Sequence, residues 1–306
     1  MHQFGQPHQL LRRELLAALL LGTCAVPAAA AQLQLPPIIA PPTQQHLVGK
    51  VIFQELVTPD LTRARQFYGS LLGWTFRDLA ADELAYTQVL LGDRTIGGMF
   101  QRSVPADEHR QSAWLTYIST LDTDATVQTA VQHGAKLLFG PRGFPDRGRE
   151  AVLADPQGAV FAVLASSSGD PPDLLAEPGE WIWSSLITRD PDAAAGFYQT
   201  LFDCEVYPAP VATGPGHLVL ASQGYARASV NPPPAARPDL HPHWLNYVRV
   251  DDAASMATRA AALGGRVLVA PRPTLRGGAI ALAADPMGAP FGLLQWSTTD
   301  STAGAQ

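Results

Sequence analysis

The sequence predicts an α+β fold made of four βαβββ units, which form two domains in tandem. Residues 51–74 have the pattern of a strand, a turn, a helix and a second strand, and residues 181–204 repeat this pattern 130 positions later. The last predicted hairpins of the two halves, at residues 155–161 and 285–291, are separated by the same 130 positions. A constant offset over this length indicates an internal duplication without net insertions.

The first unit begins with a strand at residues 50–57, which is rich in β-forming side chains. Pro59 ends this strand, and Asp60 is suited to cap a helix because its carboxylate accepts from free backbone N–H groups. Apolar residues then recur at helical spacing until Gly73, which predicts a left-handed C-cap. Three strand-like runs complete the unit, at residues 74–78, 86–91 and 95–100.

The second unit follows directly and has the same order of elements. A strand at residues 113–120 precedes a short helix at residues 122–133, which Gly134 stops. Three further strands are expected near residues 135–139, 150–154 and 159–164. The third and fourth units repeat this order in the second half of the chain.

Residues 1–31 predict a cleaved export signal. Arg12 and Arg13 precede an apolar stretch at residues 15–26, and a run of alanines ends at Ala31. The arginine pair fits a twin-arginine signal, and a general secretory signal fits equally well. A third interpretation acylates Cys24 and makes the chain a lipoprotein. All three predict an exported protein, either periplasmic or secreted.

Composition narrows the classes of function. The chain is 46% apolar and 16% charged, which is typical of a globular protein. Its net charge of −6 provides no basic patch for nucleic acid or anionic lipid, and no apolar run is long enough to span a bilayer. Cys204 is the one cysteine left once residues 1–31 are removed, so no disulfide is expected. We therefore expect a small molecule as the partner.

These signals divide the chain into six segments. They are a signal peptide at 1–31, a Pro-rich tether at 32–48, a first domain at 49–165, a linker at 166–180, a second domain at 181–297 and a tail at 298–306.

Two motifs within this order resemble a known superfamily. DxxxAxxFYxxLxG at residues 60–73 and DPxGAxF at residues 155–161 are similar to the vicinal oxygen chelate superfamily, which includes glyoxalases, bleomycin-resistance proteins and extradiol dioxygenases. The resemblance implies that each pair of units curls into a cup-shaped sheet. In active members the cup holds one divalent metal ion, which polarises two neighbouring substrate oxygens.

The resemblance also implies where the metal ligands would lie. The expected positions are on the first and fifth strands of each domain and seven residues after the Asp of DPxG. They are occupied here by Phe53, Trp114, Ala162, Trp183, Trp244 and Gly292. None of these side chains ligates a divalent cation. The sequence therefore predicts no metal cofactor, and a divalent metal held by other residues is the alternative.

Strand alternation indicates what faces each cup instead. Side chains two positions apart share a face of a strand, so Phe53 is grouped with Glu55. Aromatic walls with a few polar groups are typical of small-molecule sites, although the same rings could equally fill a core. The predicted lining residues are Phe53, Trp114, Thr116, Trp183, Ser185, Trp244 and Asn246.

Glu55 is the candidate catalytic residue. A carboxylate facing an aromatic cup can have a raised pKa and act as a general acid or base. The alternative is a solvated carboxylate at the rim, paired with an arginine. Arg142, Arg147 and Arg149 are expected in a loop at the mouth of the first cup, where they either meet an anionic ligand or are simply solvated.

Three functions remain open at this point. The first is metal-independent binding of a small apolar or aromatic molecule. The second is an enzyme, either a glyoxalase-like lyase or isomerase or a catalyst of the dioxygenase type. The third is a non-catalytic interaction protein whose cups are filled by its own side chains.

Overall fold

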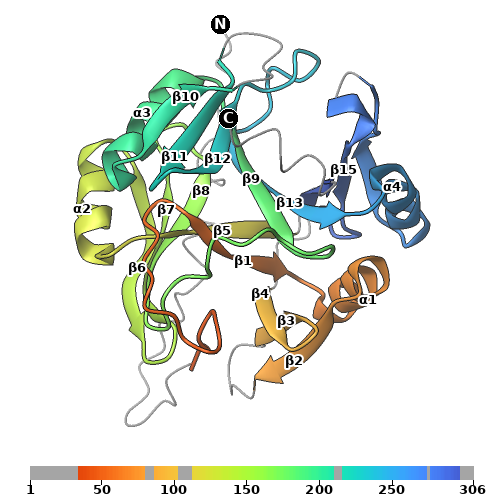
Figure 1. Cartoon of the computed structure of the whole chain (residues 1–306), viewed down its shortest axis with the longest axis horizontal. Coiled ribbons are helices and arrows are strands. Elements are labelled where there is room, and N and C mark those ends of the chain that lie inside the picture. The colour runs from red at the N-terminus through yellow and green to blue at the C-terminus, as the bar shows by residue number, and fades with distance from the viewer. Residues whose placement is uncertain (1–33, 80–85, 103–111, 210–215, 274–275, 297–306) are drawn as a thin grey trace, which may run out of the picture.

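The computed structural model describes residues 34–79, 86–102, 112–209, 216–273 and 276–296, and the statements below concern these residues. Two eight-stranded sheets, each with two helices, make up the molecule (Figure 1). The predicted α+β fold with two tandem domains is confirmed. The predicted signal peptide with Cys24, and the tail at 298–306, lie outside the described residues. No helix within the described ranges is both long and apolar enough to cross a membrane.

The first sheet has the strand order β2-β3-β4-β1-β5-β8-β7-β6. Its central strand β1 pairs in parallel with β4 and antiparallel with β5, which joins the two units at the middle of the sheet. The strands are β1 (Val51–Thr58), β2 (Thr75–Leu79), β3 (Tyr86–Leu91), β4 (Arg94–Gln101), β5 (Ala113–Ser119), β6 (Lys136–Phe144), β7 (Gly148–Ala154) and β8 (Val160–Ser166), and the helices are α1 (Leu61–Leu72) and α2 (Thr123–Gln132).

The second sheet repeats this topology as β10-β11-β12-β9-β13-β16-β15-β14. It begins at β9, 15 positions after the end of β8. Its strands are β9 (Trp181–Ile187), β10 (Glu205–Pro208), β11 (Leu218–Ser222), β12 (Tyr225–Asn231), β13 (His243–Val250), β14 (Arg266–Val269), β15 (Ile280–Ala284) and β16 (Pro290–Gln295), with helices α3 (Pro191–Phe202) and α4 (Ala253–Ala262) and the short helix η3 (Arg276–Gly278).

The predicted helix boundaries of the first unit are confirmed. The Asp60 carboxylate accepts from the backbone N–H of Arg63 at 2.9 Å, and this satisfies one of the free donors at the start of α1. Gly73 ends the helix at φ 74°, a left-handed conformation that glycine adopts without strain.

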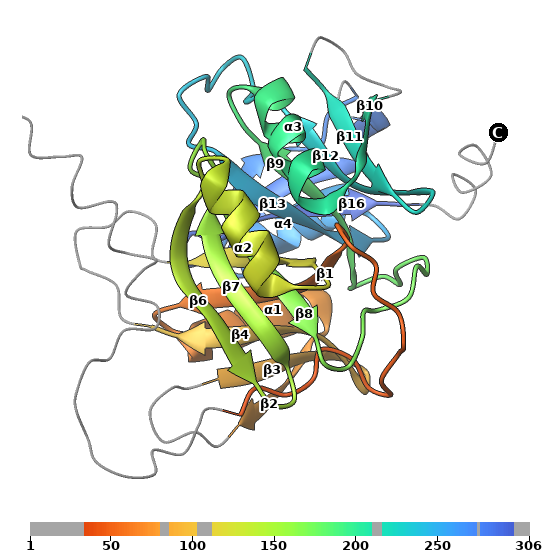
Figure 2. The ribbon, with the colours of Figure 1, turned by 90° about the vertical axis from the view of Figure 1, so that its left-hand side faces the viewer.

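Each helix packs against its own sheet and also against a helix of the other half. Helix α1 packs beside α4, and α2 packs beside α3 (Figures 1 and 2). Phe67 and Tyr68 of α1 make ring contacts with Phe291 of β16, while Phe161 of β8 contacts Tyr198 of α3. Each hydrophobic core therefore contains side chains from both halves of the chain.

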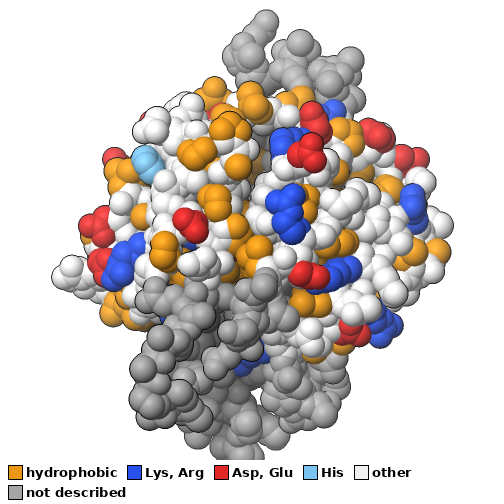
Figure 3. Space-filling view, turned by 90° about the horizontal axis from the view of Figure 1, so that it is seen from below, with side chains coloured by type: hydrophobic (Ala, Val, Ile, Leu, Met, Phe, Trp, Pro, Cys, Tyr) orange, Lys and Arg blue, Asp and Glu red, His pale blue; other side chains and the backbone are white. Residues whose placement is uncertain are grey.

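Charged side chains of both signs are interspersed on the face of the molecule that Figure 3 shows. On the described part of this face, Lys and Arg do not gather into one patch.

Candidate functional site

Each sheet has two faces. The face that packs onto helices is named the helix face, and the opposite face is named the inner face. The register decides which side chains share a face, because residues directly opposite one another on paired strands point the same way. The inner face carries Phe53, Glu55 and Tyr117 in the first sheet, and Trp183, Ser185 and Tyr247 in the second. The predicted grouping of Phe53 with Glu55, and of Trp183 with Ser185, thus holds.

The prediction that Trp114 and Thr116 line the first cup is wrong. Trp114 lies opposite Leu56, and Thr116 lies opposite Gln54, so both side chains belong to the helix face. Nε1 of Trp114 donates to the hydroxyl of Tyr68 in α1 at 2.8 Å. The physical reason is register: a slip of one residue moves a whole strand to the other face, and alternation within one strand does not fix it.

The same correction applies to Trp244 and Asn246 in the second sheet. Trp244 lies opposite Leu186, and its Nε1 donates to the hydroxyl of Tyr198 in α3 at 3.1 Å. Nδ2 of Asn246 donates to Oγ1 of Thr116 at 2.9 Å. Asn246 and Thr116 therefore join the two sheets to each other and do not face a ligand.

Glu55 is the centre of a buried polar cluster on the first inner face. Its Oε1 accepts from the Tyr86 hydroxyl at 2.7 Å and from Nη1 of Arg147 at 3.0 Å, and its Oε2 accepts from the Tyr117 hydroxyl at 2.5 Å. Glu55 and Arg147 both have 0% exposed side chains. Glu55 is therefore paired with an arginine, but it lies in the interior and not at the rim.

Arg147 reaches this cluster from the turn between β6 and β7. The expectation of a solvated arginine loop is wrong for this residue. Its Nη2 donates to the Tyr86 hydroxyl at 2.8 Å, and its guanidinium lies 4.5 Å from the centre of the Phe53 ring. Gly98 makes room for these contacts, since a Cβ there would lie 2.1 Å from the Tyr86 hydroxyl oxygen. The cluster thus depends on residues from four strands and one turn.

Residues 34–41, which we name the covering segment, close this face. They belong to the predicted Pro-rich tether, but the structure packs them against the sheet. Leu35 packs with Tyr86 and Phe100, Ile38 packs with Phe53, and both side chains are 1% exposed. Sequence reasoning missed this because the few apolar residues stand among prolines and show no periodicity.

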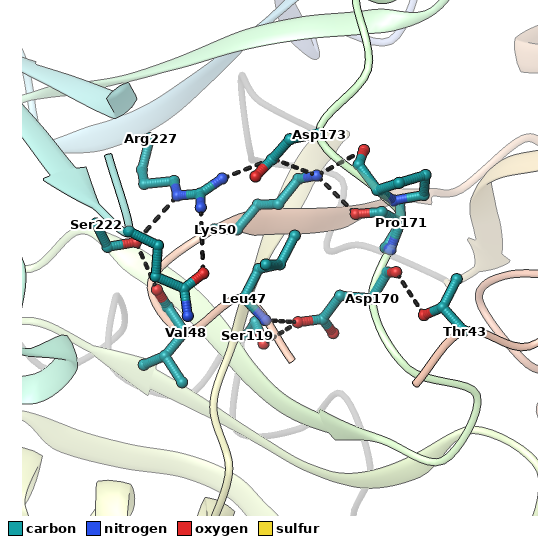
Figure 4. Close-up of polar contacts among 12 residues, drawn as sticks. Thr43, Leu47, Val48, Lys50, Ser119, Asp170, Pro171, Asp173, Ser222 and Arg227 are labelled. Atoms are coloured by element: carbon teal, nitrogen blue, oxygen red, sulfur yellow. Dashed lines mark hydrogen bonds and ion pairs between the residues drawn. The ribbon is translucent and has the colours of Figure 1, made fainter. Parts of the chain in front are cut away.

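The chain after the covering segment is fastened to the linker between the domains (Figure 4). Oγ1 of Thr43 donates to the Asp170 carbonyl at 2.8 Å, and the Asp170 carboxylate accepts from the backbone N–H of Leu47 at 2.5 Å. Further along, Lys50 forms an ion pair with Asp173 at 2.8 Å, and Asp173 also pairs with Arg227 of the second sheet. The linker therefore anchors residues 43–50, which follow the covering segment, and also contacts the second sheet through Asp173.

Glu150 of β7 adds a second carboxylate to the first inner face. It lies opposite Leu164, on the same side of the sheet as Tyr117 and Glu55. The side chain is 3% exposed, and its Oε2 has no hydrogen-bond partner within the described structure. Burial, reinforced by the Glu55 charge, raises the pKa of Glu150 to about 8. Glu150 therefore stays protonated near neutral pH.

The side chains around Ser229, at the centre of the second inner face, are uncharged, and most are partly exposed. Nε1 of Trp183 donates to Oγ of Ser229 at 3.1 Å, and Ser229 shares a 2.7 Å hydrogen bond with Ser185. Nδ2 of Asn231 donates to the same Ser229 oxygen at 3.0 Å, and the Asn231 carbonyl contacts Nδ1 of His217 at 3.0 Å. Except for Ser185, each of these side chains retains solvent exposure.

Two aromatic rings complete this face, and strand register places both there. Tyr247 is partly exposed and lies directly over Gly292, where a Cβ would come within 2.0 Å of its ring. Tyr207 of β10 lies opposite Val219, which in turn lies opposite Ser229, and its side chain is 49% exposed. The arrangement can bind a flat apolar group and orient one or two oxygens through neutral donors and acceptors.

The charged cluster of the first sheet has no counterpart in the second. At the offset of 130 positions, Glu55 becomes Ser185, Arg147 becomes Gly277 and Glu150 becomes Ile280. Glu55 pairs with Gly98 across the ladder, whereas Ser185 pairs with Ser229. The two inner faces therefore share a backbone pattern and differ in chemistry.

Among the described residues, neither inner face offers a ligand set typical of a divalent metal site. No group of three or more His, Cys, Asp or Glu side chains suited to a metal ion occurs in the described ranges. On the first face, Glu55 already accepts three hydrogen bonds and burial raises the pKa of Glu150, while the second offers His217 among hydroxyl and amide groups. Neither set supplies the three or more free ligands that zinc, manganese or iron sites use.

Comparison with known proteins agrees with this fold. Residues 43–163 match the family model described as "Glyoxalase/Bleomycin resistance protein/Dioxygenase superfamily", and residues 184–294 match a "Glyoxalase-like domain". "Putative glyoxylase CFP32" of Mycobacterium tuberculosis is 30% identical over 258 residues, which are 83% of this chain and 98% of that protein. "Anthracycline biosynthesis protein DnrV" of Streptomyces peucetius is 27% identical, over 81% of this chain and 93% of its own.

Solved structures show the same architecture. The Mn(II)-bound glyoxalase from Novosphingobium aromaticivorans has a TM-score of 0.55 and 16% identity, and covers 82% of this chain and 83% of its own. The 2,3-dioxygenase LapB from Pseudomonas sp. KL28 has a TM-score of 0.54 and 11% identity, over 83% and 94%. The chain therefore belongs to the glyoxalase/bleomycin resistance protein/dioxygenase (vicinal oxygen chelate) superfamily, in its tandem two-domain form.

Proposed function

We propose that this chain binds a small, largely apolar molecule with an aromatic ring on the inner face of the second sheet, without a metal ion. The observation that carries this proposal is the partly exposed pair of rings, Trp183 and Tyr247, beside a chain of neutral polar groups. Apolar walls with a few orienting polar atoms are typical of small-molecule sites. The first inner face is covered and buried, so the proposal places binding on the second.

The polar atoms of this face define the kind of ligand. Ser229 accepts from both Trp183 and Asn231, so these residues present hydroxyl, amide and indole groups without a formal charge. A ligand with hydroxyl or carbonyl oxygens next to its ring would find matching donors and acceptors. Two relatives are named for anthracycline biosynthesis, and anthracyclines are fused aromatic rings with such oxygens.

A titration with 1,4-dihydroxyanthraquinone, followed by quenching of tryptophan fluorescence, tests the proposal. Trp183→Ala should weaken binding about tenfold, which corresponds to about 1.4 kcal/mol. Tyr225→Ala removes an exposed aromatic ring at the β11–β12 turn and should leave binding unchanged. Equal affinity in wild type and Trp183→Ala would place the ligand elsewhere.

A metal-free enzyme is the second candidate, and His217 favours it. Because the Asn231 oxygen accepts from Nδ1, the neutral imidazole keeps its proton there and leaves Nε2 as the basic nitrogen. A base of this kind could remove a proton from a bound molecule. Turnover that survives His217→Gln at an unchanged rate would exclude this role.

We also propose that the chain is exported, either as a periplasmic or secreted protein or as a lipoprotein acylated at Cys24. The motivation is the apolar stretch between Arg13 and the alanine run that ends at Ala31. N-terminal sequencing and mass measurement of the protein from cell fractions separate these routes. A chain that still starts at Met1 in the cytoplasm would contradict export.

A further inference from the structure

We infer that the inner face of the first sheet is a second binding site, one that recognises an extended peptide-like molecule and holds residues 34–41 as an internal ligand. The inference is independent of the ligand proposed for the second sheet. It rests on how the covering segment is bound and on what it leaves unsatisfied.

The covering segment is bound in the manner of a ligand. Two branched aliphatic side chains, Leu35 and Ile38, fill separate apolar clusters on the face. Between them, the carbonyl of Pro36 accepts from Nε of Arg147 at 2.7 Å. The remaining segment residues, Gln34, Pro37 and 39–41, are partly or fully exposed. The segment therefore presents two apolar side chains with a carbonyl oxygen between them, and the face offers two apolar clusters and the Arg147 donor in matching positions.

The polar centre beneath the segment is built from side chains that are rigidly held. Arg147 is fixed on three sides by Glu55, Tyr86 and the Phe53 ring, which orients its Nε toward the Pro36 carbonyl. Preorganised donors of this kind lower the entropy that binding has to overcome. The centre is thus prepared to receive a carbonyl oxygen.

Glu150 shows that the internal ligand does not use the whole site. Its side chain is buried on the same face, yet Oε2 has no hydrogen-bond partner among the described residues. An unsatisfied buried oxygen costs about 1–3 kcal/mol. A molecule that places a hydrogen-bonding group at this oxygen would recover that free energy, because a protonated carboxyl group can both donate and accept. Proline-containing residues 36–37 have no backbone N–H to offer.

The covering segment is attached weakly enough for another molecule to replace it. Across the described part of residues 34–42, the hydrogen bond with Arg147 is the one that ties the segment to the sheet. No strand pairing includes the segment, whereas the chain from Thr43 onward is anchored to the linker. A short tether gives the segment an effective concentration on the order of millimolar, so weak contacts suffice to keep it bound.

The ligand class follows from these contacts. It is an extended, peptide-like acyl compound with two branched aliphatic groups, a carbonyl acceptor between them and a hydrogen-bonding group within reach of Glu150. A free peptide with the sequence of residues 34–41, QLPPIIAP, satisfies all but the last requirement and serves as the probe.

The test releases the segment without altering the sheet. In the full chain, Leu35→Asp with Ile38→Asp places two charges where apolar pockets lie, and should free the face. We expect this double variant to bind fluorescein-labelled QLPPIIAP, measured by anisotropy, at least about tenfold more tightly than wild type, in which the tethered copy competes. A peptide in which the leucine and first isoleucine are replaced by asparagine should not bind.

The matched control carries the same charges at exposed positions. Gln34→Asp with Ala40→Asp changes two exposed residues of the same segment and should behave as wild type. A folded Leu35→Asp/Ile38→Asp variant that does not bind the peptide would overturn the inference. A variant that no longer folds, judged by its circular dichroism spectrum, would also overturn it, because the segment would then be part of the core. The aromatic probe of the second sheet reports separately on the proposed function.

Discussion

The two inner faces show how one backbone pattern can hold opposite chemistries. The first face is charged, buried and closed by a segment of the chain itself, whereas the second is neutral and partly exposed. The difference begins with a few positions: Glu55 and Arg147 in one sheet are Ser185 and Gly277 in the other. A buried ion pair needs its geometry and hydrogen bonds completed, and the first face supplies both. The comparison teaches that duplicated cups need not keep the same side-chain chemistry.

The largest effect should come from breaking the ion pair of the first face. Arg147→Met leaves the Glu55 carboxylate buried without its counter-charge, and should lower the free energy of unfolding by about 3–5 kcal/mol. Urea denaturation measures this loss. The double variant Glu55→Gln/Arg147→Met carries neither charge and should recover most of the stability. A loss below about 1 kcal/mol in the single variant would mean that the pair is not buried as described.

The next effect concerns pH and Glu150. Burial, with the Glu55 charge, raises the pKa of this carboxyl to about 8, whereas its ordinary value is 4.5. Between these values the unfolded chain loses the proton while the folded chain keeps it, so stability falls as pH rises from about 4.5 to about 8. Glu150→Gln should remove this fall and gain about 4 kcal/mol at pH 7.5, with almost no gain at pH 4.5, since each pKa unit corresponds to about 1.4 kcal/mol.

Thermal unfolding at several pH values checks this expectation. The exposed Glu177 provides the control, since Glu177→Gln should not change the pH dependence. A Glu150→Gln variant that tracks wild type across the range would show that Glu150 is ionised in the folded protein at neutral pH.

The smallest expected effect is the difference between two tyrosines at equivalent positions, Tyr117 and Tyr247. Tyr117→Phe removes the hydroxyl that donates to Oε2 of the Glu55 carboxylate and should cost about 1.5–3 kcal/mol, as expected for a hydrogen bond to a charged group. Tyr247→Phe removes a hydroxyl that hydrogen-bonds to Ser185 and should cost about 0.5–1.5 kcal/mol. Chemical denaturation of both variants should therefore differ by about 1 kcal/mol. Equal losses would remove the contrast between the faces.

The fold could be predicted from the sequence because its signals are local and repeated. A helix cap such as Asp60, and a turn motif such as residues 155–161, report on their own backbone, and the constant offset orders them. Alternation within one strand also grouped Phe53 correctly with Glu55. The prediction that Trp114 and Trp244 point to the inner face was wrong. The register between strands depends on packing that the sequence of one strand does not encode.

The closure of the first face could not be predicted for a related reason. Arg147 lies in a turn where arginines are usually solvated, and it is buried only because Glu55, Tyr86 and the covering segment meet around it. Leu35 and Ile38 acquire their role from a sheet that the sequence places later in the chain. Contacts of this kind are visible only once the strands are assembled.

The contacts between helices of the two halves bear on the origin of the chain. Phe67 of α1 packs against Phe291, which follows it by 224 positions, so the core around the first helix is complete only after almost the whole chain has been synthesised. Contacts this distant in sequence slow folding, because a long loop has to close first. A single half of this chain would leave each helix without the helix of the other half that it packs against. An ancestor of half the length could have built the same core only by pairing with a second copy of itself, and gene fusion would then have made that partnership permanent.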